Sequence, residues 1–292
     1  MKVALYGKKF TSDFEPYFEE IAQILKKNQL EVVIHNSFFD SLPDRLKHCT
    51  ECEFFSCAAD LPKDTDAFLS IGGDGTFLDS VTYVRETGIP IAGINSGRLG
   101  FLANISKEEI KQAIEKIAKN DFHIEERELI ELSKPLGLFN DFQFALNELT
   151  ISKKDSSAMI TVTAYLNGEY LNTYWADGLI VATTTGSTAY SLSAGGPIVV
   201  PEAQNFIITP LAPHNLTVRP LVVSNNLEIT LKISGRDENY LVSLDRRYES
   251  LTADVELKIN KASFRIKVIK NSDLTFFRTL RKKLMWGLDV RN

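Results

Sequence analysis

The chain has 292 residues, which is enough for two domains that each bury a hydrophobic core. Hydrophobic residues make up 44% of the sequence and charged residues 24%, as is typical of a globular protein. The formal net charge of -5 argues against a nucleic-acid-binding surface, and no apolar run approaches the roughly 18 residues of a membrane span. We therefore expect a cytoplasmic protein with no nucleic-acid and no membrane partner.

The first part of the chain alternates strand-like and helix-like segments. Short apolar runs predict strands, and apolar residues spaced by three and four positions predict helices. The expected strands are 2–7, 31–35, 67–71 and 88–95, and the expected helices are 15–27, 42–48, 76–87 and 107–119. This alternation is typical of an α/β domain with a parallel sheet and helices on both faces. In such a sheet, ligands bind beyond the carboxyl ends of the strands.

From about residue 122 the pattern changes to short strands with few helices. Asn167-Gly168 is a strong signal for a two-residue hairpin turn. We expect an all-β, β-sandwich-like C-terminal domain over residues 123–271. The expected strands are 128–132, 142–146, 158–166, 178–182, 227–234, 240–244, 255–259 and 264–269.

A helical apolar pattern returns over residues 273–286, with basic side chains on its other face. We expect this last helix to return to the N-terminal α/β domain, which then comprises residues 1–122 and 272–292. Binding to a membrane surface is the alternative use of such a helix. The basic residues are Arg278, Arg281, Lys282 and Lys283.

The three cysteines, Cys49, Cys52 and Cys57, lie close together, with His48 beside the first of them. A structural zinc site needs four well-placed ligands, and the chain has no second C-x-x-C pair. We therefore expect reduced thiols at the surface and no metal site in this segment.

A glycine-rich turn, Gly72-Gly73-Asp74-Gly75-Thr76, follows one expected strand and precedes a helix. Glycines let the backbone approach a phosphate, and the N–H groups at the start of a helix point at it. The turn has no lysine after its last glycine, so it is not a P-loop, and Leu78 replaces the third glycine of the dinucleotide fingerprint. The carboxylate of Asp74 is suited to orient an attacking hydroxyl and to take its proton. An ordinary tight turn with an Asx hydrogen bond is the alternative.

Polar clusters also occur in the β-rich half of the chain. Asn147-Glu148 is expected at the end of a strand, and Asp177-Gly178 begins another. Residues 182–197 then combine hydroxyl side chains with glycines directly after an apolar strand. Such a segment allows a flat or phosphate-bearing ligand to approach the backbone, and Tyr190 can stack on an aromatic ring.

These motifs together resemble those of the NAD kinase family, whose members phosphorylate NAD to NADP. The resemblance comprises the G-G-D-G turn at 72–75, Asn147-Glu148, Asp177-Gly178, the T-G-S-T-A-Y segment at 185–190, and the P-H-N-L-T-x-R-P stretch at 213–220. The G-G-D-G turn is shared with diacylglycerol and sphingosine kinases and with phosphofructokinases. The T-G-S-T-A-Y segment combined with Asn-Glu is far more specific.

The resemblance implies a role for each matching residue. Asp74 is implied to be the general base for the 2′-hydroxyl of the adenosine ribose, and the turn at Gly72, Gly73, Gly75 and Thr76 to take the phosphate donor. Mg²⁺ is implied to arrive with ATP and to bridge its phosphate oxygens. The site is implied to form between the two domains and to be completed by a neighbouring subunit of a homodimer or homotetramer. The NAD contacts are implied to be Asp74, Gly75, Asn147, Glu148, Asp177, Thr188, Ala189, Tyr190, Ser191, Leu192, Ser193 and Ala212.

Two departures from the family pattern affect these expectations. Trp175 stands where many members have an arginine linked to the preference between NAD and NADH, so that preference stays open. Asp245-Arg246-Arg247 replaces a turn that is often neutral. These arginines either meet phosphate or face solvent, and we favour solvent.

Two other functions remain as alternatives. A lipid or other small-molecule kinase would use the same glycine turn, but the 185–193 segment would then be unexplained. A catalytically silent dinucleotide-binding regulator would not need an intact Asp74. The sequence also leaves open whether polyphosphate replaces ATP as the donor.

Overall fold

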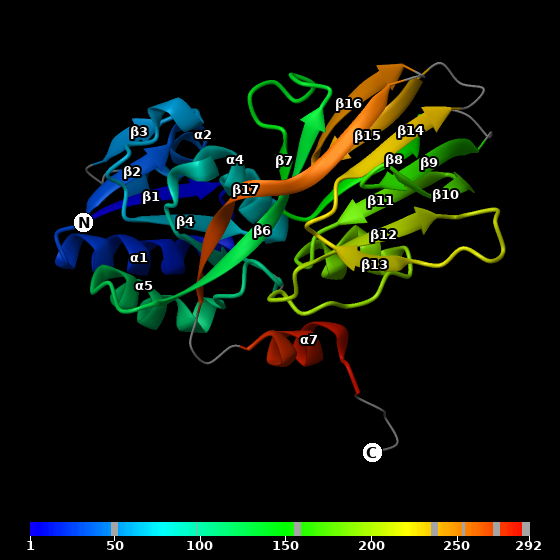
Figure 1. The fold of residues 1–292 in the computed structure, drawn as a ribbon. Helices are drawn as coiled ribbons and strands as arrows, with labels where there is room; N and C mark the ends of the chain where they lie inside the picture. Colours follow the sequence, from blue (N-terminus) through cyan, green and yellow to red (C-terminus); the bar gives the residue numbers. More distant parts are fainter. Residues whose placement is uncertain are drawn as a thin grey trace. The chain divides into compact units, whose positions relative to one another are not determined.

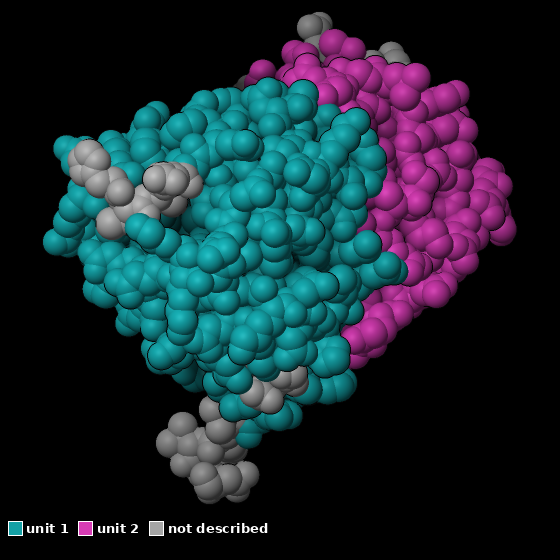
Figure 2. Space-filling model, turned by 90° about the vertical axis from the view of Figure 1, so that its left-hand side faces the viewer, with its two compact units in different colours: residues 1–126, 266–292 teal, residues 127–265 magenta. Residues whose placement is uncertain are grey.

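The computed structural model describes residues 1–47, 52–97, 99–154, 159–234, 239–252, 255–270 and 275–287 (Figure 1). The chain divides into two compact units, coloured separately in Figure 2. Unit 1 comprises Met1–Glu126 and Ile266–Asn292, and unit 2 comprises Arg127–Arg265. No described helix has the length and apolar character needed to cross a membrane.

Unit 1 contains a parallel sheet in the order β17-β5-β4-β1-β2-β3, to which β17 contributes its last residues. Its strands are β1 (Lys2–Gly7), β2 (Glu31–His35), β3 (Glu53–Phe55), β4 (Ala67–Gly72), β5 (Ile91–Asn95) and the end of β17 (Glu256–Lys270). Its helices are α1 (Glu15–Lys27), α2 (Asn36–Asp40), α3 (Asp44–Lys47), α4 (Asp74–Val84), α5 (Ile110–Ala118) and α7 (Phe276–Leu284).

The central strands β1, β4 and β5 are buried on both faces because helices cover both. Val3 and Leu5 of β1 point to one face, where they join a core with apolar residues of α1 and α5. Successive strand residues point to opposite faces, so Tyr6 lies on the other side, against Tyr83 of α4. Strands buried on both faces read as continuous apolar runs, which is why they were visible in the sequence.

Unit 2 is built from antiparallel strands in two sheets. One sheet has the order β10-β9-β14-β17, with β6 pairing with β17 and β7 with β6; the other has the order β13-β12-β11-β8-β15-β16. The elements are β6 (His123–Lys134), β7 (Phe144–Ala145), β8 (Glu148–Lys153), β9 (Ile160–Leu166), β10 (Glu169–Ala176), β11 (Gly178–Ala182), α6 (Tyr190–Ser193), β12 (Asn205–Leu211), β13 (Leu221–Ser224), β14 (Ile229–Ser234), β15 (Asn239–Leu244) and β16 (Arg247–Thr252).

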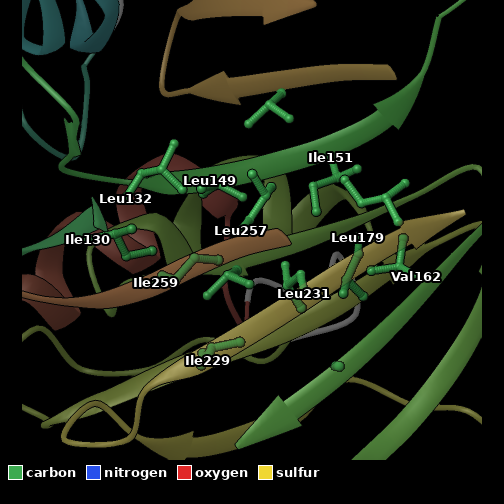
Figure 3. Close-up of a cluster of buried hydrophobic side chains, with 14 of the residues drawn as sticks. Ile130, Leu132, Leu149, Ile151, Val162, Leu179, Ile229, Leu231, Leu257 and Ile259 are labelled. Carbon is green, nitrogen blue, oxygen red and sulfur yellow. The ribbon is translucent and has the colours of Figure 1, made fainter. Parts of the chain in front are cut away.

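The two sheets of unit 2 enclose one hydrophobic core (Figure 3). Leu149, Ile151 and Leu179 come from the six-stranded sheet, while Val162 and Leu231 come from the other sheet. In a β-sandwich, residues that face the core usually alternate along each strand with polar residues that face outward. The expected fold class, an α/β domain followed by an all-β domain, is therefore confirmed.

Several element predictions need correction. Strands β3, β8, β12, β13 and β16 were not expected, and β10 was implied only by the hairpin signal at Asn167-Gly168. The two strands expected over 255–269 form the single strand β17. The strand expected over 142–146 is reduced to Phe144–Ala145. The last helix does belong to unit 1, but it begins at Phe276, where the Thr275 side chain accepts a hydrogen bond from Arg278 N–H as its N-cap.

Candidate functional site

The glycine-rich turn lies at the carboxyl end of β4, as expected for a ligand site in a parallel sheet. Gly73 is the N-cap of α4, and Asp74 is its first residue, so the helix begins two residues earlier than predicted. Thr76 N–H donates to Gly73 O at 2.9 Å, and a Cβ on Gly72 would overlap the Thr76 side chain. The Asp74 carboxylate is therefore fixed at the positive end of a helix, which favours its charged form.

Four donors surround the half-buried Asp74 carboxylate, all within unit 1. The backbone N–H groups of Leu102 and Ala103 donate to Oδ1, both at 2.9 Å, and Phe101 N–H donates to Oδ2 at 3.0 Å. Lys283 Nζ of α7 also donates to Oδ2, at 3.0 Å. Burial raises the pKa of Asp74, but these N–H groups and the lysine charge outweigh it, and the net pKa lies below its ordinary value. The carboxylate stays ionised well into the acid range.

The loop after β5 supplies these three N–H groups because the chain that follows the loop is hydrogen-bonded back to β5. Asn95 N–H donates to Ile105 O at 2.8 Å, and Ile105 N–H donates to Gly93 O at 3.0 Å. Gly100 lets the loop pass close to the acid, since a Cβ at that position would overlap the Asp74 carboxylate. The contacts of this loop with Asp74 were not predicted from the sequence.

In unit 2, the Asn147-Glu148 pair is organised by Asp245, which was not predicted as a site residue. Asp245 Oδ1 accepts the N–H groups of Asn147 and Glu148 at 2.8 and 3.2 Å, and Oδ2 accepts Leu146 N–H at 2.8 Å. Asp245 has a left-handed φ of 54°, and its own N–H donates to Glu148 O at 3.0 Å. The pair precedes and begins β8 and does not end a strand, so that expectation was wrong.

The expectation that the arginines after Asp245 face solvent was wrong for Arg247. Its guanidinium donates to the backbone oxygens of Phe142 and Phe144 and lies over the Phe142 ring, 4.9 Å from the centroid. Its charge also opposes the rise that burial causes in the pKa of Asp245. Arg246 is exposed, as expected.

Glu148 is a buried acid with an unusual protonation state. Burial, together with the negative charge of Asp245, raises the pKa of Glu148 to about 8, although a hydrogen bond from Tyr190 N–H opposes the shift. Its Oε2 atom is buried and has no hydrogen-bond partner among the described residues. At neutral pH the side chain is therefore mostly a neutral carboxylic acid with a proton to donate.

The segment after β11 folds into short helical turns, Gly186–Thr188 and α6, which were not predicted from the sequence. It is joined to the Asn147-Glu148 pair, because Thr183 N–H donates to Asn147 O at 2.8 Å. Several of its hydroxyls are used within the fold; the buried Ser191 hydroxyl, for example, lies 2.9 Å from Thr209 Oγ1. Of the other residues implied to contact NAD, Thr188, Ala189 and Leu192 are half-buried, and Tyr190 and Ser193 are exposed.

Asp177 and Ala212 lie at the opposite end of β11 from these residues. In the register of the sheet, Ala182 pairs with Glu148, whereas Gly178 pairs with Leu211. The distance along the strand from Asp177 to residue 183 is roughly 20 Å at the usual rise per residue. Asp177 pairs with Lys153 at 2.6 Å, and Trp175 is 53% exposed. Within one chain, the implied NAD contacts of unit 2 therefore form two separate groups.

The cysteine segment shows no metal site in the part of the chain that is described. Cys52 is half-buried and Cys57 is exposed, while Cys49 and His48 lie outside the described residues. Desolvation raises the pKa of the Cys52 thiol, which makes it less reactive.

The motifs and the fold agree with comparisons to known proteins. The family models described as ATP-NAD kinase N-terminal domain and ATP-NAD kinase C-terminal domain match residues 8–122 and 146–271. The chain is 47% identical to an NAD kinase of Flavobacterium psychrophilum and 43% identical to one of Bacteroides fragilis, over 100% of both chains in each case.

Two solved structures resemble the fold described above. An NAD kinase from Archaeoglobus fulgidus in complex with ATP superimposes with a TM-score of 0.75 at 29% identity, covering 98% of this chain and 99% of that one. A yeast NADH kinase complexed with NADH has a TM-score of 0.85 at 22% identity, covering 100% and 89% of the two chains, and supports the fold alone. By its sequence along its whole length, the chain belongs to the ATP-NAD kinase family.

Proposed function

We propose that this protein transfers the γ-phosphoryl group of ATP to the 2′-hydroxyl of the adenosine ribose of NAD, forming NADP and ADP. Membership of the ATP-NAD kinase family supports the reaction and the substrates. The observation that carries the proposal is the carboxylate of Asp74, held at a glycine-rich strand-to-helix turn by three backbone N–H groups.

Asp74 is the general base in this proposal. A secondary ribose hydroxyl is a weak nucleophile, so a positioned carboxylate contributes by orienting it and by accepting its proton, an effect of roughly 10²–10⁴-fold. Catalysis of phosphoryl transfer consists mainly of positioning and charge stabilisation. The glycine turn at Gly72, Gly73, Gly75 and Thr76 is assigned to the phosphate donor, since its glycines permit close approach of the backbone.

The proposed NAD contacts in unit 2 use a neutral acid and a stacking surface. Glu148, protonated at neutral pH, would donate a hydrogen bond to the ribose from the Oε2 side that has no partner in the described structure. Tyr190 is 47% exposed and is free to stack on a base. The remaining contacts are Asp74, Gly75, Asn147, Asp177, Thr188, Ala189, Ser191, Leu192, Ser193 and Ala212.

A divalent cation such as Mg²⁺ is proposed to enter with ATP. The described residues contain no group of three His, Cys, Asp or Glu side chains arranged to hold a metal. In kinases, Mg²⁺ is commonly bound by substrate phosphates and water together with one or two carboxylates. When bound, the ion neutralises the charge that develops on the transferring phosphoryl group.

A homodimer or homotetramer is part of the proposal. Asp177 and Ala212 lie roughly 20 Å along β11 from the Glu148 group, as judged from the rise per strand residue. Two such separated groups are readily explained if Asp177 and Ala212 serve the site of a neighbouring subunit. A cytoplasmic location completes the proposal and agrees with the ordinary globular composition.

One assay separates this function from its alternatives. Purified protein is incubated with Mg-ATP and NAD, NADH or diacylglycerol, and the products are separated by chromatography. We expect NADP from NAD. Phosphorylation of diacylglycerol alone would indicate a lipid kinase, and NAD binding without turnover would indicate a regulator. Parallel reactions with polyphosphate as donor and NADH as acceptor define the two specificities that the sequence leaves open.

A further inference from the structure

One face of the last helix packs on unit 1, and Lys283 belongs to that face. Thr279 and Leu280 are buried, and the ring of Phe276 lies against the Phe101 ring with centroids 6.2 Å apart. Positions 276, 279, 280 and 283 are spaced by three and four residues and so share one side of the helix. Lys282, the preceding residue, is rotated by about 100° from this face.

The Lys283 ammonium group contacts both the proposed base and the loop that holds it. Its Nζ atom lies 3.0 Å from Asp74 Oδ2 and 4.7 Å from the centroid of the Phe101 ring. The side chains of Lys283 and Asp74 are 31% and 30% exposed, so the pair is open to solvent and can exchange partners. An ion pair this exposed contributes little to folding.

The two oxygens of Asp74 differ in what they can still accept. Oδ1 receives two backbone N–H groups, and these are fixed by the loop. Oδ2 receives one backbone N–H group and the lysine. A substrate hydroxyl that gives its proton to Asp74 must therefore approach Oδ2, where Lys283 is the partner on a flexible side chain.

We propose that Lys283 is a mobile catalytic residue, which pairs with Asp74 before the donor binds and contacts the γ-phosphate oxygens of the bound donor during transfer. This inference rests on the proposed kinase function. A lysine ammonium is a compact cation on a flexible stem and a common phosphate ligand. Its departure from Asp74 frees Oδ2 and makes the acid a stronger base at the moment when the base is needed.

The chemical step balances without any change in the protonation of Lys283. The ribose 2′-oxygen forms a bond to the γ-phosphorus, while the bond from that phosphorus to the bridging oxygen breaks and ADP leaves. The hydroxyl proton passes to Asp74 Oδ2 and is later released to water. The lysine remains an ammonium ion throughout and only stabilises charge on the transferring group.

The required movement is within the reach of the side chain. A hydroxyl oxygen bonded to Oδ2 lies about 3 Å from it and, in a reactive arrangement, about 3–3.5 Å from the phosphorus. The phosphorus therefore lies within roughly 6.5 Å of Oδ2, by addition of these two distances. Because Lys283 Nζ is already 3.0 Å from Oδ2, rotation of its side chain suffices and α7 can stay in place.

The test uses the full chain with three variants: Lys283→Met, Lys283→Arg and the matched control Lys282→Met. Steady-state rates with Mg-ATP and NAD are measured from pH 3 to pH 9, because the pKa of Asp74 lies below its ordinary value and its acidic limb is expected at the low end of this range. Mg-ATP and NAD binding are measured separately by calorimetry. We expect Lys283→Met to lower kcat by roughly 10–100-fold, as expected for loss of a charged group that stabilises the transition state. Mg-ATP binding should weaken and NAD binding should not change.

Two further readouts distinguish a catalytic role from a structural one. Removing the lysine charge raises the pKa of Asp74, so the acidic limb of kcat/KM should move to higher pH in Lys283→Met. Lys283→Arg should recover most of the rate and the original limb, and Lys282→Met should match the wild type. If Lys283→Met fails to fold in a thermal unfolding control, Lys283→Gln is measured in its place.

The inference requires both the loss of kcat and the shift of the acidic limb, so any other combination contradicts it. An unchanged or increased kcat in the folded variant would show that Lys283 only covers Asp74. A wild-type protein that forms no NADP would instead overturn the proposed function itself, which keeps the two failures distinguishable.

Discussion

The carboxylate of Asp245 accepts a hydrogen bond from the N–H group of Glu148, whose own carboxyl group is buried and interacts with that same negative charge. The two acids have unequal surroundings. Asp245 receives three backbone N–H groups and lies near the Arg247 guanidinium, whereas Glu148 receives one N–H group from Tyr190. Burial raises the pKa of both acids, but Asp245 has more groups that stabilise its charged form, so the negative charge that the two acids share is better stabilised on Asp245 and the proton on Glu148.

The first prediction concerns the pH dependence of stability. The folded protein keeps the Glu148 proton up to about pH 8, whereas the unfolded chain loses it near the ordinary glutamate pKa of about 4.3. The folded state thus binds more protons in this window, and the Glu148 contribution to stability falls as pH rises through it. Glu148→Gln removes this contribution. We expect Glu148→Gln to raise the unfolding free energy, relative to the wild type, by more at pH 8 than at pH 5.

Urea unfolding at the two pH values measures this difference, with the exposed Glu202→Gln as a matched control. An equal effect of Glu148→Gln at both pH values would contradict a raised pKa for Glu148.

The second prediction concerns Asp245 as the residue that holds the Asn147-Glu148 pair. Asp245→Asn replaces a charged acceptor by an amide that cannot accept all three N–H groups, so we expect a loss of about 1–3 kcal/mol in unfolding free energy. Because the charge beside Glu148 disappears, NAD binding should also lose part of its dependence on pH near 8. Arg246→Gln, at the next and exposed position, is the control. A variant as stable as the wild type would show that the three hydrogen bonds are dispensable.

The third prediction concerns the close approach of the Phe101–Ala103 loop to Asp74. A Cβ at Gly100 would overlap the Asp74 carboxylate, so Gly100→Ala must displace the loop or the acid. Misplacing a catalytic group by about 1 Å can cost roughly 100-fold in rate, and we expect a fall in kcat of roughly 10–100-fold. At Gly97 a Cβ meets open space, so Gly97→Ala should retain the wild-type rate. Equal rates for the two variants would rule out the tight fit at Gly100.

The fourth prediction concerns the proposed base. Asp74→Asn keeps the size of the side chain but cannot accept the proton, and we expect kcat to fall by roughly 10²–10⁴-fold. NAD binding measured by calorimetry should stay close to that of the wild type, because the amide oxygen still accepts hydrogen bonds. Full activity in this variant would exclude Asp74 as the general base.

Local features of this protein were readable from sequence. The turn at residues 72–76 depends on neighbouring glycines and on a strand-to-helix change, both of which leave a pattern over a few residues. The central parallel strands of unit 1 are mostly apolar because both of their faces are buried.

Features that depend on distant contacts were not readable. Lys283 reaches Asp74 across 209 positions and Asp245 reaches Leu146 across 99, and no spacing rule links such residues. The strand β16 (Arg247–Thr252) is a mostly exposed edge strand, so it lacks the apolar alternation that marks a half-buried strand. The sequence placed a basic stripe on the last helix, but only the structure shows that Lys283 is the lysine that contacts Asp74.

A structure of the protein bound to NAD and a non-hydrolysable ATP analogue tests the central claim most directly, through the distance from the adenosine ribose 2′-oxygen to Asp74. The account predicts that this oxygen lies about 3 Å from Oδ2, within hydrogen-bond reach, and faces the terminal phosphorus of the analogue. A ribose bound well beyond that distance, with another side chain against its 2′-oxygen, would contradict the role assigned to Asp74.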